Sequence, residues 1–545
     1  MSVDSITATR PAPRSVTTFK RPSIDAISAC VLAVIGALAV LMATSSIIGL
    51  GPDSATYLSA AVNFSRGHGL SVFDTSPLAI FGPAYPRLIA AVMGLGLSPL
   101  QAARWINAVA AGATVWLAYL IIRRHVTAPW IRIAATATVL ISSILLQVEA
   151  MAWSEPLFIA LSLLLIVMLE SILAQRGPMV TVILAGMVAA VAFLDRYAGL
   201  ALILLGVACL ISPISKRNWR RPLSQSAVYL VFAGAVPLVW MMRNHAVSGT
   251  YMGARYNSSQ TVASVLSGLG NWTGRWLIPT PYYAHDALFS LSRGLMEFVG
   301  LLVLAGVFVA AGYVLFNHRT DDADASRGTY SLVPLLLAAV IYAAYLAFSE
   351  LTTALDPINP RLFSPLAVPL IILAAVGVER LLASKFGARR GVKVALAVIV
   401  GIVLVNQVFA WQSNVRDFTN NPYAVYSRAP WTNSPLSKVV AGLPATEAIQ
   451  SNVPFGLWID VQNRTIVASP LRTAYSSGQL LGVSQQWIDS ISCTPTYLAW
   501  FRSGPSIYLT PLQLSKYVQV KEVNQWRDGY LYTLRIKPGT TAACH

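Results

Sequence analysis

Long apolar runs, separated by short polar or Gly/Pro-containing segments, extend from residue 24 to residue 411. A transmembrane helix needs about 20 mainly apolar residues to cross the hydrocarbon core of a bilayer, and several of the runs reach that length. The pattern therefore predicts an α-helical polytopic membrane protein with about eleven transmembrane helices. The expected spans are, in order, 24–50, 100–122, 129–148, 156–174, two short spans within 178–212, 224–242, 291–316, 330–348, 362–382 and 392–411.

The segments outside these spans predict the domain organisation. Residues 1–23 are polar, basic and rich in Ser, Thr and Pro, which is typical of a disordered tail. Gly and Pro break residues 51–99 into what we expect to be two short interfacial helices, beginning near residues 54 and 84. Residues 412–545 mix polar positions with strand-like stretches, so we interpret them as a soluble domain of mixed α and β structure. Between the tail and this domain, residues 24–411 form the predicted membrane domain.

A polar loop of roughly 45 residues is expected after the span that ends near Arg243-Asn244. It contains Trp272, Trp276, Tyr282 and Tyr283. Because Trp and Tyr are enriched where a membrane meets water, these four side chains are interpreted as an interfacial aromatic belt.

The composition agrees with a membrane protein. Apolar residues make up 55% of the chain and charged residues only 11%, whereas soluble domains carry about 25% charged residues. The net charge of +17 does not indicate nucleic acid, because Lys and Arg collect on the cytoplasmic side of membrane proteins. Here they concentrate in the tail and in alternate loops. This bias predicts a multi-pass protein of the cytoplasmic (inner) membrane, with a cytoplasmic N-terminus and an extracytoplasmic C-terminal domain.

The cysteines and the spacing of possible ligands predict no metal site. Cys30 and Cys209 lie in apolar runs, where cysteine behaves as a small hydrophobic residue. Cys493 and Cys544 lie in the polar C-terminal region and could pair if that region is outside the cell, or stay free. No cluster has the spacing of metal ligands, so neither a metal nor another cofactor is expected.

Many acids and arginines that interrupt the apolar pattern fall on the predicted outer face, whose loops contain Arg but no Lys. They are Asp53, Asp74, Glu149, Glu155, Asp195, Arg196, Arg243, Arg255, Asp286, Glu350, Asp356 and Arg361. Asp53 is the most unusual, since it directly follows the first apolar run, and ionisable groups at the membrane are costly and suggest function. The alternative is that Asp53 only caps the short helix that follows it.

These residue types together suit one kind of chemistry. A guanidinium group binds a phosphate through two parallel hydrogen bonds and keeps its charge at any relevant pH. A carboxylate within hydrogen-bond reach of a hydroxyl can act as a general base. The combination fits the attack of an alcohol on a sugar carbon whose leaving group is a phosphate, which needs no acid to depart. A single displacement of this kind inverts the anomeric centre, and a lipid-linked phosphate would explain the position at the membrane.

Six segments carry a resemblance to a known family. They are Asp53 with Ala55–Ala61; Phe81–Pro86; Trp153–Phe158; Ala185–Gly199; Pro237–Trp240 with Arg243-Asn244, Ser248-Gly249 and Arg255; and Pro360–Leu366. In this order they resemble the integral-membrane glycosyltransferases of the GT-C fold, in particular the bacterial branch related to protein O-mannosyltransferases and lipid A aminoarabinose transferases. The chain departs from the family at Ser54, where many relatives have a second acid, and at Gly82, where some have a basic residue.

The resemblance covers most of residues 24–411 and implies a GT-C fold. It also implies a polyprenyl-phosphate sugar as donor and transfer to a hydroxyl of a glycan, lipid or protein acceptor on the outer face. It makes Asp53 the catalytic base and Glu155 a second acid that orients the acceptor or the sugar. The implied substrate-binding residues are, with the arginines in order of preference, Arg243, Arg255, Arg196, Arg361, and then Tyr57 and Tyr85.

Several alternatives stay open at this point. Each arginine could instead anchor lipid head groups or pair with a nearby acid, and Glu155 could simply favour the start of its helix. At the level of the whole protein, the alternatives are a transporter or flippase of lipid-linked glycans, a glycan ligase, and a non-catalytic scaffold. A transporter should show internal repeats and broken helices near the midplane, and no repeat between the halves is visible.

Overall fold

The computed structural model describes most of the chain. The described residues are 24–174, 178–212, 219–255, 257–277, 287–317, 331–385, 387, 389–420, 426, 431, 433–444, 446–461, 464–472, 480–492 and 496–537. The predicted tail 1–23 and the possible pair Cys493 and Cys544 lie outside them.

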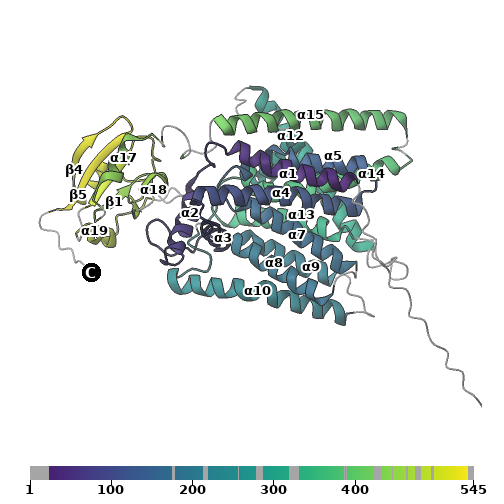
Figure 1. The fold of residues 1–545 in the computed structure, drawn as a ribbon, viewed down its shortest axis with the longest axis horizontal. Helices are drawn as coiled ribbons and strands as arrows, with labels where there is room; N and C mark the ends of the chain where they lie inside the picture. Colours follow the sequence, from purple (N-terminus) through teal and green to yellow (C-terminus); the bar gives the residue numbers. More distant parts are fainter. Residues whose placement is uncertain are drawn as a thin grey trace, which may run out of the picture.

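The membrane domain is a bundle of helices, most of which run side by side (Figure 1). The helices are α1 (Ile24–Ala43), α2 (Pro52–Ser65), α3 (Ala84–Met93), α4 (Pro99–His125), α5 (Pro129–Leu140), α6 (Ser143–Glu149), α7 (Glu155–Leu173), α8 (Met179–Asp195), α9 (Leu200–Ile211), α10 (Arg220–Ser248), α11 (Val262–Leu277), α12 (Ala287–Asn317), α13 (Val333–Thr352), α14 (Pro360–Ala383) and α15 (Arg390–Asn420).

A helix occupies each position at which the apolar pattern predicted a span, but not every helix is long enough to cross a bilayer. Among the described residues, eight helices are long and apolar enough, or nine if α5 and α6, which are bent by 45° at their junction, form one span. The helices α8 and α9, predicted as short spans, are among the shorter apolar helices.

The expected loop after α10 is partly helical. The helix α10 continues to Ser248, and α11 follows at Val262–Leu277. The Trp272 indole donates a hydrogen bond to the Ile358 carbonyl at 2.6 Å, and Trp276 is buried. These two side chains, four residues apart on one helical face, pack against protein, so the expectation of an interfacial belt is wrong for them. Tyr282 and Tyr283 are outside the described residues.

Backbone contacts bring the start of α2 next to the start of α7. Gly49 donates to the Ala150 carbonyl at 2.8 Å, and Ala152 donates back to the Gly49 carbonyl at 2.9 Å. The Asn107 amide of α4 secures the same place by donating to the carbonyl oxygens of Glu149 and Met151. Buried backbone groups that are paired in this way fix the relative position of the two segments, and each segment leads directly into an acid-bearing helix.

The C-terminal domain contains a five-stranded sheet of order β2-β1-β3-β5-β4. Its elements are α17 (Pro435–Gly442), β1 (Ala448–Ser451), α18 (Pro454–Val461), β2 (Ile466–Ala468), α19 (Gln485–Ser492), β3 (Thr496–Phe501), α20 (Pro511–Leu514), β4 (Val518–Gln525) and β5 (Gly529–Ile536). β1 pairs in parallel with β2 and β3, whereas β5 pairs antiparallel with β3 and β4. The domain therefore has the mixed α and β structure that the sequence predicts.

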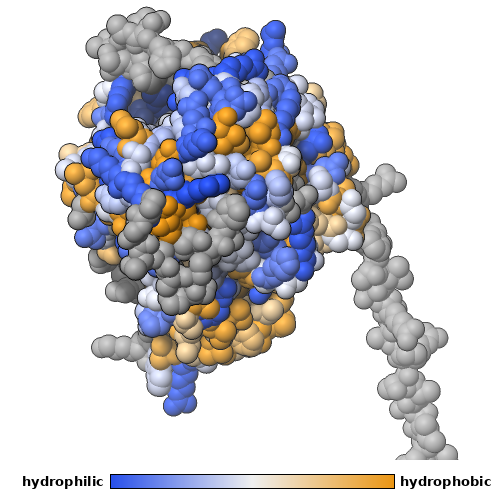
Figure 2. All heavy atoms as spheres, turned by 90° about the vertical axis from the view of Figure 1, so that its left-hand side faces the viewer, coloured by the Kyte–Doolittle hydropathy of each residue, from blue (hydrophilic) through white to orange (hydrophobic). Residues whose placement is uncertain are grey.

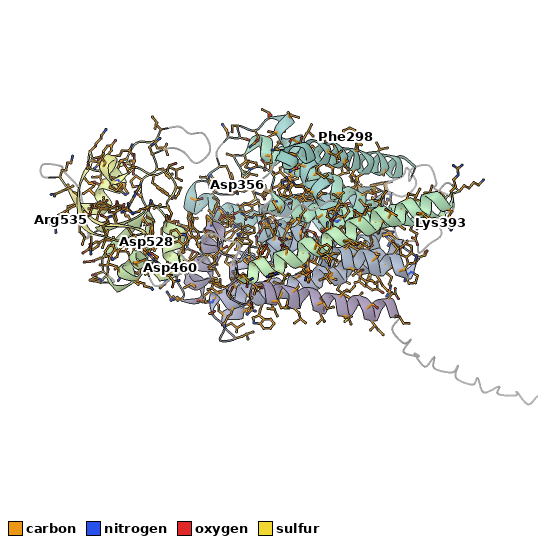
Figure 3. The ribbon with its side chains drawn as sticks, turned by 90° about the horizontal axis from the view of Figure 1, so that it is seen from above. Phe298, Asp356, Lys393, Asp460, Asp528 and Arg535 are labelled. Carbon is orange, nitrogen blue, oxygen red and sulfur yellow. The ribbon has the colours of Figure 1, made fainter. Side chains whose placement is uncertain are left out.

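The C-terminal domain sits at the end of the bundle that carries α2 and α3 (Figure 1). The Ile466 amide donates to the Phe73 carbonyl at 3.2 Å, and the Phe73 and Phe455 rings meet edge to face at 5.0 Å. In the view onto this end, hydrophilic side chains cover much of the surface (Figure 2). Asp460, Asp528 and Arg535 lie in this domain, while Lys393 lies at the opposite end of the bundle (Figure 3).

A glycine controls how the segment before α3 passes the end of α8. A Cβ atom at Gly82 would lie 1.8 Å from the backbone oxygen of Leu194. This close approach explains why a basic residue is absent at Gly82, since no side chain fits there.

We expect Gly82→Ala to lower the melting temperature of the purified protein in detergent, because overpacking costs about 1–3 kcal/mol. The matched control is Gly234→Ala in α10, where a Cβ would meet nothing within 4 Å and alanine favours the helix. Equal melting temperatures for the two variants would contradict the close approach.

Candidate active site

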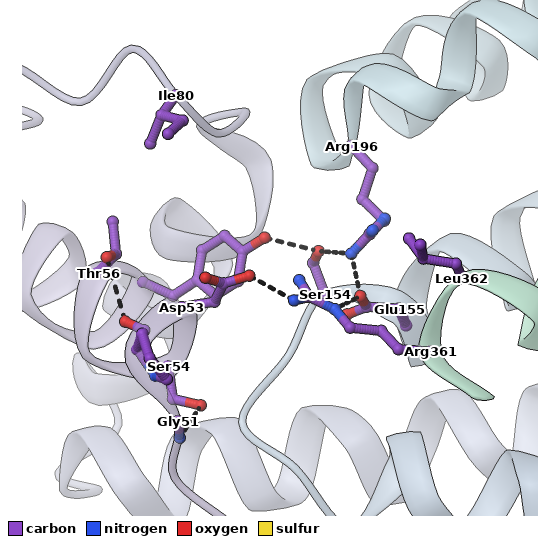
Figure 4. A network of polar contacts seen from close by, with 12 residues as sticks. Gly51, Asp53, Ser54, Thr56, Ile80, Ser154, Glu155, Arg196, Arg361 and Leu362 are labelled. Atoms are coloured by element: carbon purple, nitrogen blue, oxygen red, sulfur yellow. Dashed lines mark hydrogen bonds and ion pairs between the residues drawn. The ribbon is translucent and has the colours of Figure 1, made fainter. Parts of the chain in front are cut away.

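Two acids and two arginines from four separate places in the chain form one cluster of ion pairs (Figure 4). The Arg361 Nη1 atom lies 2.5 Å from Asp53 Oδ2, and Arg361 Nε bonds to Glu155 Oε1. Arg196 pairs with the same Glu155 oxygen through its Nη1 atom. The cluster therefore runs in the order Asp53, Arg361, Glu155, Arg196, with two positive and two negative charges.

Asp53 lies in the first turn of α2 and does not cap it. The N-cap residue is Gly51, and Pro52 occupies the first helical position, where its fixed φ suits the start of a helix. The Gly51 amide donates instead to the Ser54 hydroxyl at 3.1 Å. With its capping function taken by neighbours, the Asp53 carboxylate is free to face Arg361. The carboxylate is also favourably placed at the positive end of the helix dipole.

Glu155 is the first residue of α7, and its side chain is fully buried, with 0% exposure. A buried carboxylate needs opposite charge and hydrogen bonds to compensate for its lost hydration. Glu155 Oε1 has both arginines, whereas the buried Oε2 atom has no hydrogen-bond partner among the described residues. The Glu155 carboxylate is thus the common anchor of the two guanidinium groups.

Arg196 reaches this anchor because the backbone breaks between α8 and α9. Arg196 has an extended conformation, with φ −146° and ψ 135°. Its Nη1 atom also donates to the Ser154 hydroxyl at 3.4 Å. The position of Asp195 directly before Arg196 predicts an internal ion pair between them. In the structure Asp195 is buried, and its carboxylate oxygens have no hydrogen-bond partner among the described residues. That prediction is wrong, since Arg196 pairs with Glu155.

Tyr57 and Tyr85 form an aromatic wall beside the ion pairs. Their rings meet edge to face at 5.3 Å, and the Tyr57 ring lies 4.9 Å from that of Phe81. The Tyr57 hydroxyl shares a hydrogen bond of 3.1 Å with the Ser154 hydroxyl. Burial raises the pKa of Tyr57 above its usual range, because a phenolate would lose its hydration. Tyr57 is therefore a neutral hydrogen-bonding group next to the acids.

Tyr85 is enclosed more completely. Its side chain is 0% exposed, and its hydroxyl donates to the Asn107 side chain at 2.9 Å. Burial also raises its pKa well above the ordinary value. Tyr85 contacts the Tyr57 ring and the Asn107 side chain. It therefore packs against Tyr57 and is not a member of the ion-pair cluster.

Arg243 and Arg255, the arginines preferred from the sequence, hold the segment before α3 and do not contact the acids in this structure. Arg243 Nη1 donates to the Leu78 carbonyl at 2.6 Å, and its guanidinium lies 4.8 Å from the Trp240 ring centre. Arg255 Nη2 donates to the Ile80 carbonyl at 3.2 Å. Arg196 and Arg361, which came last in the predicted order of preference, are the arginines that the fold brings to Asp53 and Glu155.

Trp153 is a site residue that sequence reasoning did not select. Its ring stacks on the Arg361 guanidinium, with 4.6 Å between the ring centre and Cζ. The Trp153 indole nitrogen is buried and has no hydrogen-bond partner among the residues described. The signal available in the sequence was its position two residues before Glu155, since Arg readily stacks on aromatic faces.

The remaining acids of the predicted outer face lie elsewhere. Asp74 accepts hydrogen bonds from the Ser76 amide and hydroxyl within its own turn. Glu350 and Asp356 lie around the α13–α14 connection, and Asp286 is outside the described residues. In the described parts of the chain, no group of three His, Cys, Asp or Glu side chains could hold a metal ion.

Comparison with known proteins identifies the fold. No family model matches the sequence, and no curated protein matches it. The structure is similar to ArnT from Cupriavidus metallidurans in the apo state, with a TM-score of 0.57 and 13% identity over 93% of this chain and 98% of ArnT. The same ArnT bound to undecaprenyl phosphate gives a TM-score of 0.57 and 13% identity over 92% of this chain and 97% of ArnT.

Two further neighbours have lower coverage of their own length. The arabinofuranosyltransferase AftD from Mycobacteria has a TM-score of 0.53 and 15% identity, covering 94% of this chain and 42% of AftD. The oligosaccharyltransferase AglB from Archaeoglobus fulgidus, in complex with an inhibitory peptide and a dolichol-phosphate, has a TM-score of 0.50 and 11% identity, covering 87% of this chain and 69% of AglB. All three neighbours are glycosyltransferases of the GT-C fold, and this chain has that fold.

The shared anchor leads to a stability prediction. In Glu155→Gln the two guanidinium groups lose their buried counter-charge. We therefore expect the free energy of unfolding to fall by about 3–5 kcal/mol, which is measured as a lower melting temperature. The control is Glu297→Gln, which makes the same chemical change in the Arg293–Glu297 pair, whose side chains are 59% and 26% exposed. Exposed pairs contribute about 0–1 kcal/mol. A Glu155→Gln protein as stable as the control would refute the anchoring role.

Proposed function

We propose that this protein is an inverting membrane glycosyltransferase, which moves a hexosyl or pentosyl unit from a polyprenyl-phosphate donor to an acceptor hydroxyl. The observation that carries the proposal is the pairing of Asp53 with Arg361 at the head of α2. Their side chains are 25% and 18% exposed, whereas Glu155 behind them is fully buried. A substrate that enters the site would thus meet a carboxylate and a guanidinium side by side.

In the proposed reaction Asp53 is the general base. The acceptor hydroxyl gives its proton to the Asp53 carboxylate while its oxygen forms a bond to the anomeric carbon. The bond between that carbon and the phosphate oxygen breaks, and its electron pair stays on the phosphate. A guanidinium beside the phosphate stabilises the departing anion through charge-assisted hydrogen bonds. Attack from the face opposite the leaving group inverts the anomeric configuration.

The neighbours support the class of donor. ArnT binds undecaprenyl phosphate, and AglB binds a dolichol-phosphate together with a peptide. We therefore extend a lipid-phosphate donor to this chain, with a glycan, lipid or protein as acceptor and membrane lipids as surroundings. Arg361 and Arg196 are the phosphate-side candidates by their contacts with the acids. Arg243 and Arg255 are assigned to holding the segment before α3.

The reaction can be tested with Asp53→Asn in purified full-length protein supplied with a polyprenyl-phosphate sugar. We expect turnover to fall by about 10²–10⁴, the usual contribution of a general base, and the wild-type product to have an inverted anomeric centre. The control is Asp356→Asn, which removes an exposed acid on the connection before α14 and should keep wild-type turnover.

Other results would favour the alternatives. Movement of an intact lipid-linked sugar across vesicles, with no bond cleaved, would indicate a flippase. Transfer only of preassembled glycans would indicate a ligase. Full turnover by a folded Asp53→Asn protein would remove Asp53 as the base.

For the orientation, we propose a cytoplasmic N-terminus and an extracytoplasmic C-terminal domain in the cytoplasmic membrane. Support comes from Lys393, which lies at the end of the bundle opposite the C-terminal domain (Figure 3), since basic residues collect on the cytoplasmic side of a membrane protein.

Single accessible cysteines test this orientation in a background that carries Cys30→Ser, Cys493→Ser and Cys544→Ser, which leaves the buried Cys209 as the remaining native cysteine. Leu512→Cys, at a position 81% exposed in the C-terminal domain, should react with a membrane-impermeant maleimide in intact cells stripped of their outer layers. Arg390→Cys, at the exposed start of α15, should react only after lysis. The reverse pattern of labelling would invert the proposed topology.

A further inference from the structure

The two carboxylates bound by Arg361 differ in how easily they can be replaced. Glu155 holds Arg361 Nε from the buried side and is itself tied to Arg196. Asp53 holds Nη1 from the open side and has no second ion pair among the described residues. The Asp53 side chain is 25% exposed and can be reached by an incoming anion, whereas Glu155 is fully buried and pairs with two arginines, so removing it from Arg361 is strongly unfavourable. Arg361 thus has one fixed partner and one exchangeable partner.

We propose that Arg361 exchanges Asp53 for the phosphate of the donor, so that binding of the donor frees the base. This inference rests on the proposed function, because it requires a lipid phosphate in the site. Before the donor binds, Asp53 Oδ2 faces the guanidinium of Arg361 and not an acceptor hydroxyl. After the donor binds, the phosphate takes over Nη1, and the Asp53 oxygen becomes available to the acceptor hydroxyl.

The charges of the cluster favour this exchange. Two guanidinium groups already balance two carboxylates, so a donor phosphodiester brings one negative charge that lacks a partner. Arg196 is engaged by Glu155 and by Ser154, which leaves the Asp53 side of Arg361 as the place where an incoming anion competes with an existing one. Arg binds phosphate and carboxylate with the same geometry, so one can replace the other without a new binding group.

The surroundings of Arg361 allow the exchange without movement of the guanidinium itself. The Trp153 ring, 4.6 Å from Cζ, and the bond from Nε to Glu155 hold its plane and its direction. A phosphate that replaces Asp53 would therefore find a preorganised guanidinium.

The exchange sets the order of substrate binding. An acceptor that arrives first finds the base occupied, whereas one that arrives after the donor finds it free.

The test is equilibrium binding of undecaprenyl phosphate to the purified full-length protein in detergent, followed by tryptophan fluorescence. Because Asp53 competes with the phosphate, Asp53→Asn should bind undecaprenyl phosphate about threefold or more tightly than wild type. Asp53→Ala should do the same. The control Asp356→Asn removes one negative charge near α14 without touching Arg361, so its affinity should equal that of wild type. In the double variant Asp53→Asn/Arg361→Gln the gain should disappear.

The outcomes separate this inference from the proposed function. If folded Asp53→Asn and Asp53→Ala proteins bind undecaprenyl phosphate no more tightly than wild type, the exchange is overturned while the donor class stands. If Asp356→Asn gains as much as Asp53→Asn, the gain is a general charge effect and the exchange is also overturned. If neither wild type nor Asp53→Asn binds undecaprenyl phosphate in preference to phosphatidylglycerol, the donor class itself is wrong and the exchange falls with it.

Discussion

The arrangement of the candidate site depends on one carboxylate that is completely withdrawn from water. Glu155 compensates for its lost hydration with two guanidinium groups, and this requirement draws α14 and the α8–α9 junction to the start of α7. Asp53 is then added through Arg361 on the open side. The geometry of the site is therefore a consequence of electrostatic compensation at a single buried position.

The sequence predicted the helices because they depend on local patterns. A helix stands wherever an apolar run predicted a span, and the short helices after residue 51 begin at Pro52 and Ala84. Asp53 and Glu155 were selected because each follows a break in the apolar pattern, and the structure brings them to one guanidinium. Such features require no knowledge of which helix packs against which.

Which arginines contact the acids could not be predicted from the sequence, because it depends on tertiary contacts. Arg361 and Arg196 meet the acids because the Gly49–Ala150 backbone hydrogen bond and the bond from the Asn107 side chain to the Met151 carbonyl align α2 with α7, and because Arg196 has an extended backbone. Arg243 also lies next to a break in its apolar run, yet its guanidinium donates to a backbone carbonyl oxygen and not to an acid. The helix α11 was missed for a related reason, since its aromatic residues suit an interface as well as a packed face.

The segment before α3 has a consequence for biosynthesis. Phe73 in that segment is held by Ile466 and Phe455, which lie in the last quarter of the chain, and Asp53 is neutralised by Arg361, far beyond it in sequence. During translation the N-terminal part of the site leaves the ribosome long before either partner exists. Helix α2 therefore stays incompletely paired until α14 has been inserted and the C-terminal domain has docked. Assembly of the site is then among the last events of folding.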